Sequence, residues 1–334
     1  MPLERPVSFE DAARGVSLTV QPGPPARLDL GFRTADGLQI SAQVPADAAA
    51  LEDLAAVMAA PGDAHLDDQR LRFGNLARRA ALAMPTAANA LRAVAQWLLR
   101  SREDTNYTYD LTPPNKLYLA HLIAVVTARP VAEIKGFIAE IETDAPLRDH
   151  LARAHDAQSP AARGVSDRTA RYSRRIGWYA LVRALKPRLV IETGVDKGLG
   201  SVVLCAALLR NRAEGAAGCY LGTDIRPEAG ALLTAPYNEV GRIAYGDSIG
   251  TLATITEPID MFINDSDHSA EYEAREYETI APRLSDRSVI LGDNAHVTER
   301  LAAFAESTGR RFVFFKEQPA DHCYLGAGIG IAFR

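Results

Sequence analysis

The sequence predicts an α/β protein with a doubly wound, mainly parallel seven-stranded sheet and an N-terminal, mostly helical domain preceded by a β-hairpin. Three observations lead to this fold class. Beyond residue 167, short apolar runs alternate with helical patterns, which is typical of βαβ units. A glycine-rich segment follows the first run, and acidic residues follow several others. Pro160 and Gly164 interrupt the helical patterns within residues 156–167, which predicts a linker between two domains, 1–155 and 167–334.

Composition limits the function classes. The net charge of −5 gives no electrostatic reason to expect a nucleic-acid partner, so we expect a small-molecule substrate. The three cysteines have neither metal-ligand nor disulfide-framework spacing, which favours a reducing compartment. The longest apolar stretch, residues 117–128, is far shorter than the ~20 residues that cross a bilayer. Because the N-terminus lacks a secretory pattern, we expect a cytoplasmic protein without a membrane partner.

The N-terminal domain is predicted from local patterns. Residues 26–44 alternate apolar and polar side chains around a turn at 35–37, which predicts the β-hairpin. From about residue 46 the apolar spacing becomes helical. Segment 101–115 is polar, rich in aromatic residues and ends in two prolines, so it is predicted to be an ordered loop. Its residues 106–110 are candidates for either a substrate-facing loop or a packed interdomain loop.

The C-terminal elements follow in a regular order. A helix that includes Trp178 and Leu185 leads to Pro187 and then to the first buried strand, 189–191. The remaining pattern predicts strands at 219–223, 242–245, 259–263, 288–292, 312–315 and 328–333, with helices at 200–211 and 269–284. In such sheets, ligands bind outside the carboxyl ends of the strands. The candidate functional residues are therefore those that follow each strand.

The first strand end carries a candidate cofactor loop. Glu192, Gly194, Gly198, Gly200 and Ser201 belong to the segment ETGVDKGLGS, which opens the next helix. Glycine lets the backbone turn tightly and approach a ligand, and the free N–H groups of a helix N-terminus attract an anion. The loop therefore suits the carboxylate of a cofactor.

The second and third strands end in acids. Asp224 follows the second strand, where a carboxylate can accept hydrogen bonds from both hydroxyls of a ribose. Asp247 follows the third strand and supplies another acceptor beside the same crevice. Together with the glycine loop, these acids predict a nucleoside-binding edge.

The fourth and fifth strands end in oxygen ligands. Asp265 follows the fourth strand, and the pair Asp293-Asn294 follows the fifth. Parallel strands deliver these side chains to the same edge of the sheet, so we expect them to converge. Three oxygen donors suit a hard divalent cation such as Mg²⁺, with positions left for water or a chelating substrate.

These motifs resemble those of class I S-adenosylmethionine-dependent methyltransferases. The resemblance covers about residues 167–334 and implies a Rossmann-like fold with S-adenosyl-L-methionine as cofactor. It implies that the glycine loop and Ser201 face the methionine part, that Asp224 binds the ribose and that Asp247 binds the adenine amine. By the same resemblance Glu192 stands near the ammonium group, and Asp265 is a further candidate for cofactor contact.

A closer resemblance is to metal-dependent small-molecule O-methyltransferases of the catechol, caffeoyl-coenzyme A and macrolide-sugar types. The caffeoyl type reads DADK where this chain reads DSDH, so Asp265 matches the first Asp and His268 replaces the catalytic Lys. The macrolide-sugar type has a His at that spacing but an acid where Asn294 stands. The resemblance implies Mg²⁺ or another divalent cation on Asp265, Asp293 and Asn294, and His268 as general base, with His296 in reserve.

The implied reaction is methylation of a hydroxyl on a small molecule or natural product. By analogy with related enzymes, residues 1–155 would cover the substrate site or make a dimer contact, giving a homo-oligomer. Residues 193–200 also match the TGxxxGxG loop of short-chain dehydrogenases, an NAD(P)-dependent alternative. That class needs a Tyr with Lys four residues on, which this sequence lacks. A non-catalytic cofactor-binding protein is the other alternative, although it would not need the set around Asp265 and His268.

Overall fold

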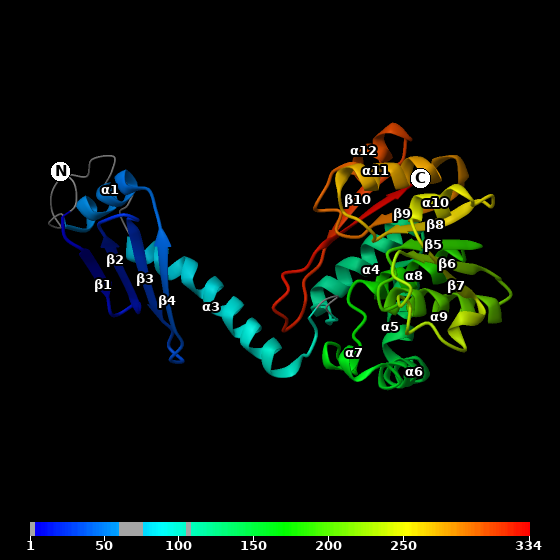
Figure 1. The fold of residues 1–334 in the computed structure, drawn as a ribbon, viewed down its shortest axis with the longest axis horizontal. Coiled ribbons are helices and arrows are strands. Elements are labelled where there is room, and N and C mark those ends of the chain that lie inside the picture. The colour runs from blue at the N-terminus through cyan, green and yellow to red at the C-terminus, as the bar shows by residue number, and fades with distance from the viewer. Residues whose placement is uncertain (1–3, 60–75, 105–107) are drawn as a thin grey trace. The chain divides into compact units, whose positions relative to one another are not determined.

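The computed structural model describes residues 4–59, 76–104 and 108–334. It divides into two compact units, Met1–Trp97 and Leu98–Arg334, shown in blue to cyan and in cyan to red in Figure 1. Each unit has its own sheet and its own apolar core.

The first unit contains a four-stranded antiparallel meander. Its strands are β1 (Val7–Asp11), β2 (Val16–Gln21), β3 (Arg27–Arg33) and β4 (Gln39–Pro45). The predicted hairpin is confirmed as β3 and β4, and two further strands precede it. Helices α1 (Ala48–Ala59) and α3 (Leu76–Arg100) contribute Leu51, Leu54 and Ala88 to the cores on this sheet.

The second unit begins with helices. They are α4 (Pro113–Thr127), α5 (Val131–Thr143), α6 (Ala145–Asp156), α7 (Pro160–Gly164) and α8 (Arg175–Leu185). The Thr112 hydroxyl caps α4 by accepting from the Asn115 amide at 3.4 Å, and Asp144 caps α6 by accepting from Leu147 at 2.9 Å. Such caps satisfy amides that the first helical turn leaves without partners.

The seven-stranded sheet confirms the predicted α/β class. Its order is β10-β11-β9-β8-β5-β6-β7, and the pairs among β5 to β9 are parallel, whereas β11 is antiparallel to both neighbours. The strands are β5 (Leu189–Thr193), β6 (Cys219–Asp224), β7 (Gly241–Tyr245), β8 (Ile259–Asn264), β9 (Leu284–Gly292), β10 (Arg311–Lys316) and β11 (Gly328–Phe333). The helices between them are α9 (Leu199–Ala213), α10 (Ser248–Ala253), α11 (Ala270–Ile280) and α12 (Arg300–Ser307).

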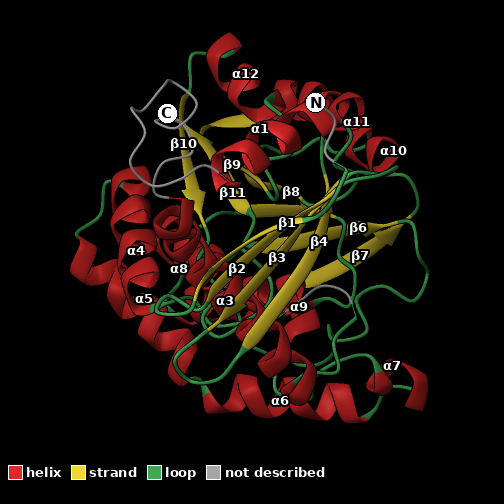
Figure 2. Cartoon of the chain, turned by 90° about the vertical axis from the view of Figure 1, so that its left-hand side faces the viewer, coloured by secondary structure: helices red, strands yellow, loops and turns green. Residues whose placement is uncertain are grey.

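Helices cover both faces of this sheet, as Figures 1 and 2 show. Successive strand residues point to opposite faces, so Val190 joins the core beneath α8 and α9, while Ile191 joins the core beneath α10 to α12. Fully buried strands with both faces covered read as continuous apolar runs, which is the pattern that the sequence shows.

The compact units differ from the predicted domain boundary. Helices α4 to α6 belong to the sheet unit, because Ile123, Ile134 and Leu151 lie in the same buried cluster as Trp178 of α8 and Val190 of β5. The polar segment 156–167 is therefore a connection on this unit and not a boundary between compact units. Among the described residues, no helix has the length and apolarity needed to cross a membrane.

Candidate active site

The predicted functional residues meet at the carboxyl edge of the parallel strands. Strands β6, β5, β8 and β9 are neighbours, and each ends at a predicted acid or leads directly into one. A pocket of about 360 Å³ lies there. Its lining includes Arg174, Arg175, Glu192, Gly194, Asp196, Arg226, Asp265, Asp293, Asn294 and Tyr324. The predicted convergence of Asp265, Asp293 and Asn294 therefore occurs.

Two glycines permit close approaches in the loop after β5. Gly194 has a φ of +79°, and a Cβ there would lie 1.9 Å from the backbone oxygen of Asp265. A Cβ on Gly200 would lie 2.2 Å from a carboxylate oxygen of Glu192. In this structure the two glycines allow the loop to lie against the end of β8 and over Glu192.

Glu192 is a buried acid at the end of β5. Its carboxylate accepts hydrogen bonds from the Tyr220 and Ser201 hydroxyls, the latter at 3.4 Å. Burial raises the pKa of Glu192 to about 7, against the lowering effect of Tyr220 and Arg175. Ser201, predicted to contact the cofactor, is itself fully buried and lies 2.7 Å from the Tyr220 hydroxyl. The structure thus places Ser201 behind Glu192 and gives it a supporting role.

Asp224 and Asp247 both hold backbone amides. Asp224 accepts from the amides of Asp196 and Arg226, each at 2.9 Å, which ties the glycine loop to the end of β6. Asp247 caps α10 by accepting from Gly250 at 2.9 Å. It also accepts from Tyr272 at 2.7 Å, and this bond leads the causes that lower the pKa of Asp247. A carboxylate has lone pairs beyond these bonds, so ribose and adenine contacts stay predictions for the two acids.

The carboxylates of Asp265 and Asp293, which the sequence predicts to bind metal, lie around the guanidinium of Arg174. The buried guanidinium of Arg174 contacts both oxygens of Asp293 and lies 3.8 Å from an oxygen of Asp265. Burial is the largest cause that raises the pKa of Asp265 well above its usual range. The charge of Asp293 also raises this pKa, and the charge of Arg174 lowers it in part. Burial opposes ionisation of Asp293 too, but Arg174 and a hydrogen bond from Asp265 outweigh it and lower the pKa of Asp293.

His268 lies beside this cluster, between the side chains of Asn294 and Glu273. Its Nε2 lies 3.1 Å from Nδ2 of Asn294 and 3.8 Å from Asp265, while its Nδ1 faces the buried carboxylate of Glu273 at 3.8 Å. The same Asn294 nitrogen lies 3.4 Å from Asp293, so it is a donor to the carboxylate and to the imidazole. With Asn294 as donor, Nε2 of His268 is the ring acceptor, and Nδ1 faces Glu273 without a hydrogen bond.

The reserve candidate His296 lies elsewhere. Its exposed side chain lines a different pocket, with Phe312 and Phe314. Burial, followed by the positive charge of Lys316, lowers the pKa of His296.

The polar loop before α4 packs within the sheet unit and contacts residues next to Arg174. Its residues 105–107 lie outside the described part of the chain. Tyr109 is fully buried, and its hydroxyl donates to Glu317, whose charge also acts on Arg174. The backbone of Ser173 donates to the oxygen of Tyr109 at 2.9 Å, which helps to place the residue before Arg174. Tyr109 therefore packs within the sheet unit and does not face a substrate.

Sequence reasoning missed two functional candidates, Arg174 and Glu273. Arg174 directly precedes α8 and belongs to no motif, so nothing local in YSRRIGWY marks it. Glu273 had a usable signal, because it lies five residues after His268 in the first turns of the predicted helix.

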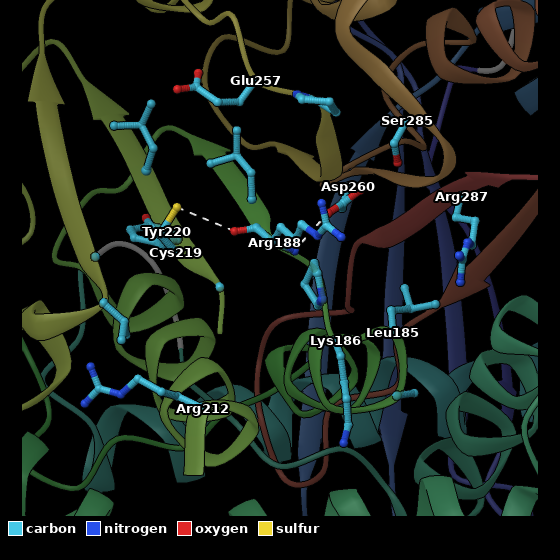
Figure 3. A pocket seen from close by; sticks show the side chains of 18 of the residues that line it. Leu185, Lys186, Arg188, Arg212, Cys219, Tyr220, Glu257, Asp260, Ser285 and Arg287 are labelled. Atoms are coloured by element: carbon cyan, nitrogen blue, oxygen red, sulfur yellow. Dashed lines mark hydrogen bonds between the residues drawn. The ribbon is translucent and has the colours of Figure 1, made fainter. Parts of the chain in front are cut away.

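A larger cavity of the sheet unit lies at the opposite end of the strands (Figure 3). It measures about 1260 Å³ and is lined by residues at the amino ends of the strands, including Arg188, Cys219, Gly241 and Ser285. Arg188 is held there by a 2.8 Å hydrogen bond from its amide to Asp260. Since none of the predicted functional residues lines it, we place the candidate active site at the smaller pocket.

Comparison with known proteins agrees with this location. Residues 191–295 match a family model described as a methyltransferase domain. This range begins in β5 and ends just after Asp293 and Asn294, so it contains the glycine loop and each acidic strand end described above. No curated protein sequence matches the chain.

Several solved structures resemble part of the chain at low sequence identity. The cofactor-bound protein Rv0187 from MTB is 17% identical with a TM-score of 0.44, over 57% of this chain and 90% of that one. The SAH-bound methyltransferase PaMTH1 of Podospora anserina is 12% identical with a TM-score of 0.42, over 69% and 100%. The O-methyltransferase TomG from Streptomyces achromogenes, in complex with SAM, is 18% identical with a TM-score of 0.39, over 57% and 89%.

The strand order, the glycine loop and the family match agree with one another. The sheet unit has a Rossmann-like fold, and its residues 191–295 match a methyltransferase domain. The dehydrogenase alternative is not favoured, because the matched segment is a methyltransferase domain.

Proposed function

We propose that this protein transfers the methyl group of S-adenosylmethionine to a hydroxyl oxygen of a small molecule, with His268 as general base. The observation that carries the proposal is the convergence of Glu192, Gly194, Asp265 and Asn294 on one pocket, with His268 beside Asp265 and Asn294. The protein's negative net charge agrees with a small-molecule acceptor rather than a nucleic acid. All three cysteines carry free thiols, and the cytoplasm remains the expected location.

The residues at the strand ends suit the proposed cofactor. Glu192 lines the pocket and offers a carboxylate to the ammonium group, while the glycine loop brings its backbone to the same place. Asp224, mostly buried at the end of β6, retains lone pairs for the ribose hydroxyls. When bound, S-adenosylmethionine supplies a methyl group that is already strongly electrophilic.

The remaining task for the chain is to provide an oxygen nucleophile. We propose that Nε2 of His268, released from its hydrogen bond with Asn294, takes the proton of the acceptor hydroxyl as the oxygen–carbon bond forms and the carbon–sulfur bond breaks. The imidazole would then release the proton to solvent. The buried carboxylate of Glu273 faces Nδ1 on the other side of the ring and helps to orient it, as in other histidine–carboxylate pairs.

A divalent cation, which the sequence also predicts, does not fit the side chains as they lie. Mg²⁺ needs oxygen ligands at about 2.1 Å in near-octahedral geometry. Both oxygens of Asp293 are engaged by Arg174, and the same guanidinium faces Asp265. Among the residues that the structure describes, no group of three or more His, Cys, Asp or Glu side chains has an arrangement that could hold a metal ion.

Calorimetry and a methyl-transfer assay test the proposed function. We expect S-adenosylhomocysteine to bind the protein, and labelled methyl from the cofactor to appear on an acceptor from a panel of phenols, catechols and sugar hydroxyls. His268→Ala should keep the calorimetric binding and lose transfer. Binding without transfer to any acceptor would favour a non-catalytic cofactor-binding protein, and absence of binding would reject the proposal.

The N-terminal unit is proposed to cover the substrate site or to form a dimer contact. Light scattering and activity of a fragment that begins at Leu98 test this role, because the sheet unit starts there. A fragment that matches the intact protein in both mass behaviour and activity would contradict it.

A further inference from the structure

The cluster at the ends of β8 and β9 contains its own cation. Arg174 directly precedes α8, and 9% of its side chain is exposed, against 1% for Asp293 and 16% for Asp265. Its guanidinium makes a two-point contact with Asp293, through Nε and Nη2. The Nη2 atom also approaches Asp265, so one nitrogen lies between the two acids.

This position is the one that a shared metal ion would need. A metal held by Asp265 and Asp293 must touch an oxygen of each, and Nη2 of Arg174 faces Oδ2 of both residues. An aromatic ring and the backbone also help to position the guanidinium. It lies 5.7 Å from the ring centre of Trp178, and the backbone before it is bound to the loop at Tyr109.

Arg174 already supplies a positive charge to the carboxylates of the cluster. Its guanidinium pairs with Asp293 and faces Asp265. Glu317, which interacts with Tyr109, is a further carboxylate whose charge acts on Arg174. A divalent ion would need both Asp265 and Asp293 ionised and unpaired, and it would place two further charges beside a buried guanidinium.

The arginine also faces the pocket. A guanidinium has five N–H donors, and one of them, on Nη2, is hydrogen-bonded to Asp293. Arg174 lines the pocket together with Asn294 and Tyr324, so its charge acts on a ligand bound there. A fixed positive charge favours the ionised form of a neighbouring hydroxyl. A bound metal ion has the same effect on a hydroxyl in metal-dependent methyl transfer.

We propose that Arg174 takes the place of the divalent cation between Asp265 and Asp293, so that this methyltransferase works without a metal. The inference rests on the proposed function, because it concerns the same pocket and the same acceptor hydroxyl. It separates this chain from the metal-dependent O-methyltransferases that its strand-end acids resemble.

Manganese binding tests the inference without relying on turnover. Mn²⁺ is titrated into the full-length protein with S-adenosylhomocysteine present, and free Mn²⁺ is followed by its electron paramagnetic resonance signal. We expect no saturable site in the wild type up to about 1 mM. Arg174→Met, which frees the two acids, should bind Mn²⁺ about tenfold or more tightly than the wild type. Adding Asp293→Asn to this variant should remove the gained site, and Arg174→Lys, which keeps the charge, should not gain it.

The outcomes distinguish the two proposals. A saturable Mn²⁺ site in the wild type that Asp293→Asn removes would overturn the role of Arg174, even if every arginine variant failed to fold. A folded Arg174→Met variant that gains no Mn²⁺ site would overturn it as well. Wild-type turnover unchanged by EDTA is expected, and its loss with recovery on adding Mg²⁺ would count against the inference. Failure to bind S-adenosylhomocysteine in calorimetry would instead reject the proposed function.

Discussion

Gly194→Ala should damage both stability and cofactor binding, because the loop after β5 lies against the end of β8. The positive φ of +79° costs an alanine about 1 kcal/mol relative to glycine. Its Cβ would lie 1.9 Å from the Asp265 oxygen, so the two segments must separate by about 1.5 Å to reach ordinary contact. That movement would break the 3.0 Å hydrogen bond from the Asp265 amide to Thr193, a buried bond whose loss costs about 1–3 kcal/mol.

The expected loss is therefore about 2–4 kcal/mol in the free energy of unfolding. The matched control is Gly215→Ala, which has a φ of +85° and nothing within 4 Å of the added Cβ, and which lies in the turn after α9. It should lose only about 1 kcal/mol and leave the site intact. Urea unfolding measures the stabilities, and calorimetry should show S-adenosylhomocysteine affinity lowered about tenfold or more for Gly194→Ala alone. Equal stability and equal affinity in the two variants would refute the close approach of loop and strand.

Three further predictions concern charge, catalysis and domain structure. The pKa of Glu192 is raised from 4.5 to about 7, so the folded protein favours the protonated form of this side chain. Its contribution to the free energy of unfolding is fully present below about pH 4.5 and is lost as the pH rises through about 7. Urea unfolding between about pH 5 and about pH 8 should show a steeper decline for the wild type than for Glu192→Gln, and parallel curves would contradict the shift. His268→Ala should lower kcat by about 10²–10⁴-fold, whereas His296→Ala should change it less than about threefold, and steady-state kinetics that rank them in reverse would reassign the base. The fragment Leu98–Arg334 should unfold cooperatively in calorimetry, because it keeps both apolar cores of the sheet. The shorter fragment Asp167–Arg334 should not, because it lacks helices that bury Trp178. A cooperative transition in the shorter fragment would favour the boundary predicted from sequence.

The sheet could be predicted because its strands are buried on both faces. Continuous apolar runs such as Met261–Ile263 indicate buried strands in a chain that alternates them with helices. Once the strands are parallel, topology alone brings Asp265 and Asp293 to one edge, whatever the details of packing. Short elements were harder, and the six residues of α10 are too few to show a helical period.

Other features depended on contacts that no local pattern records. The half-exposed strand β1 has no turn signal comparable to that of the β3–β4 hairpin. The sequence predicted a divalent cation as the positive partner of Asp265, Asp293 and Asn294. Arg174 supplies that charge from a loop in which Ser173 adopts a φ of +47°, and neither the loop geometry nor the pairing has a sequence signature.

The ion pair between Arg174 and Asp293 joins residues 119 positions apart in the chain. Arg174 comes before the first strand of the seven-stranded sheet, and Asp293 comes after the fifth. The contact therefore cannot form until the intervening strands and helices have assembled, since only the completed parallel order brings the two together. The compensation of the Asp293 charge by Arg174 is thus a property of the assembled sheet unit and of no single segment of the chain.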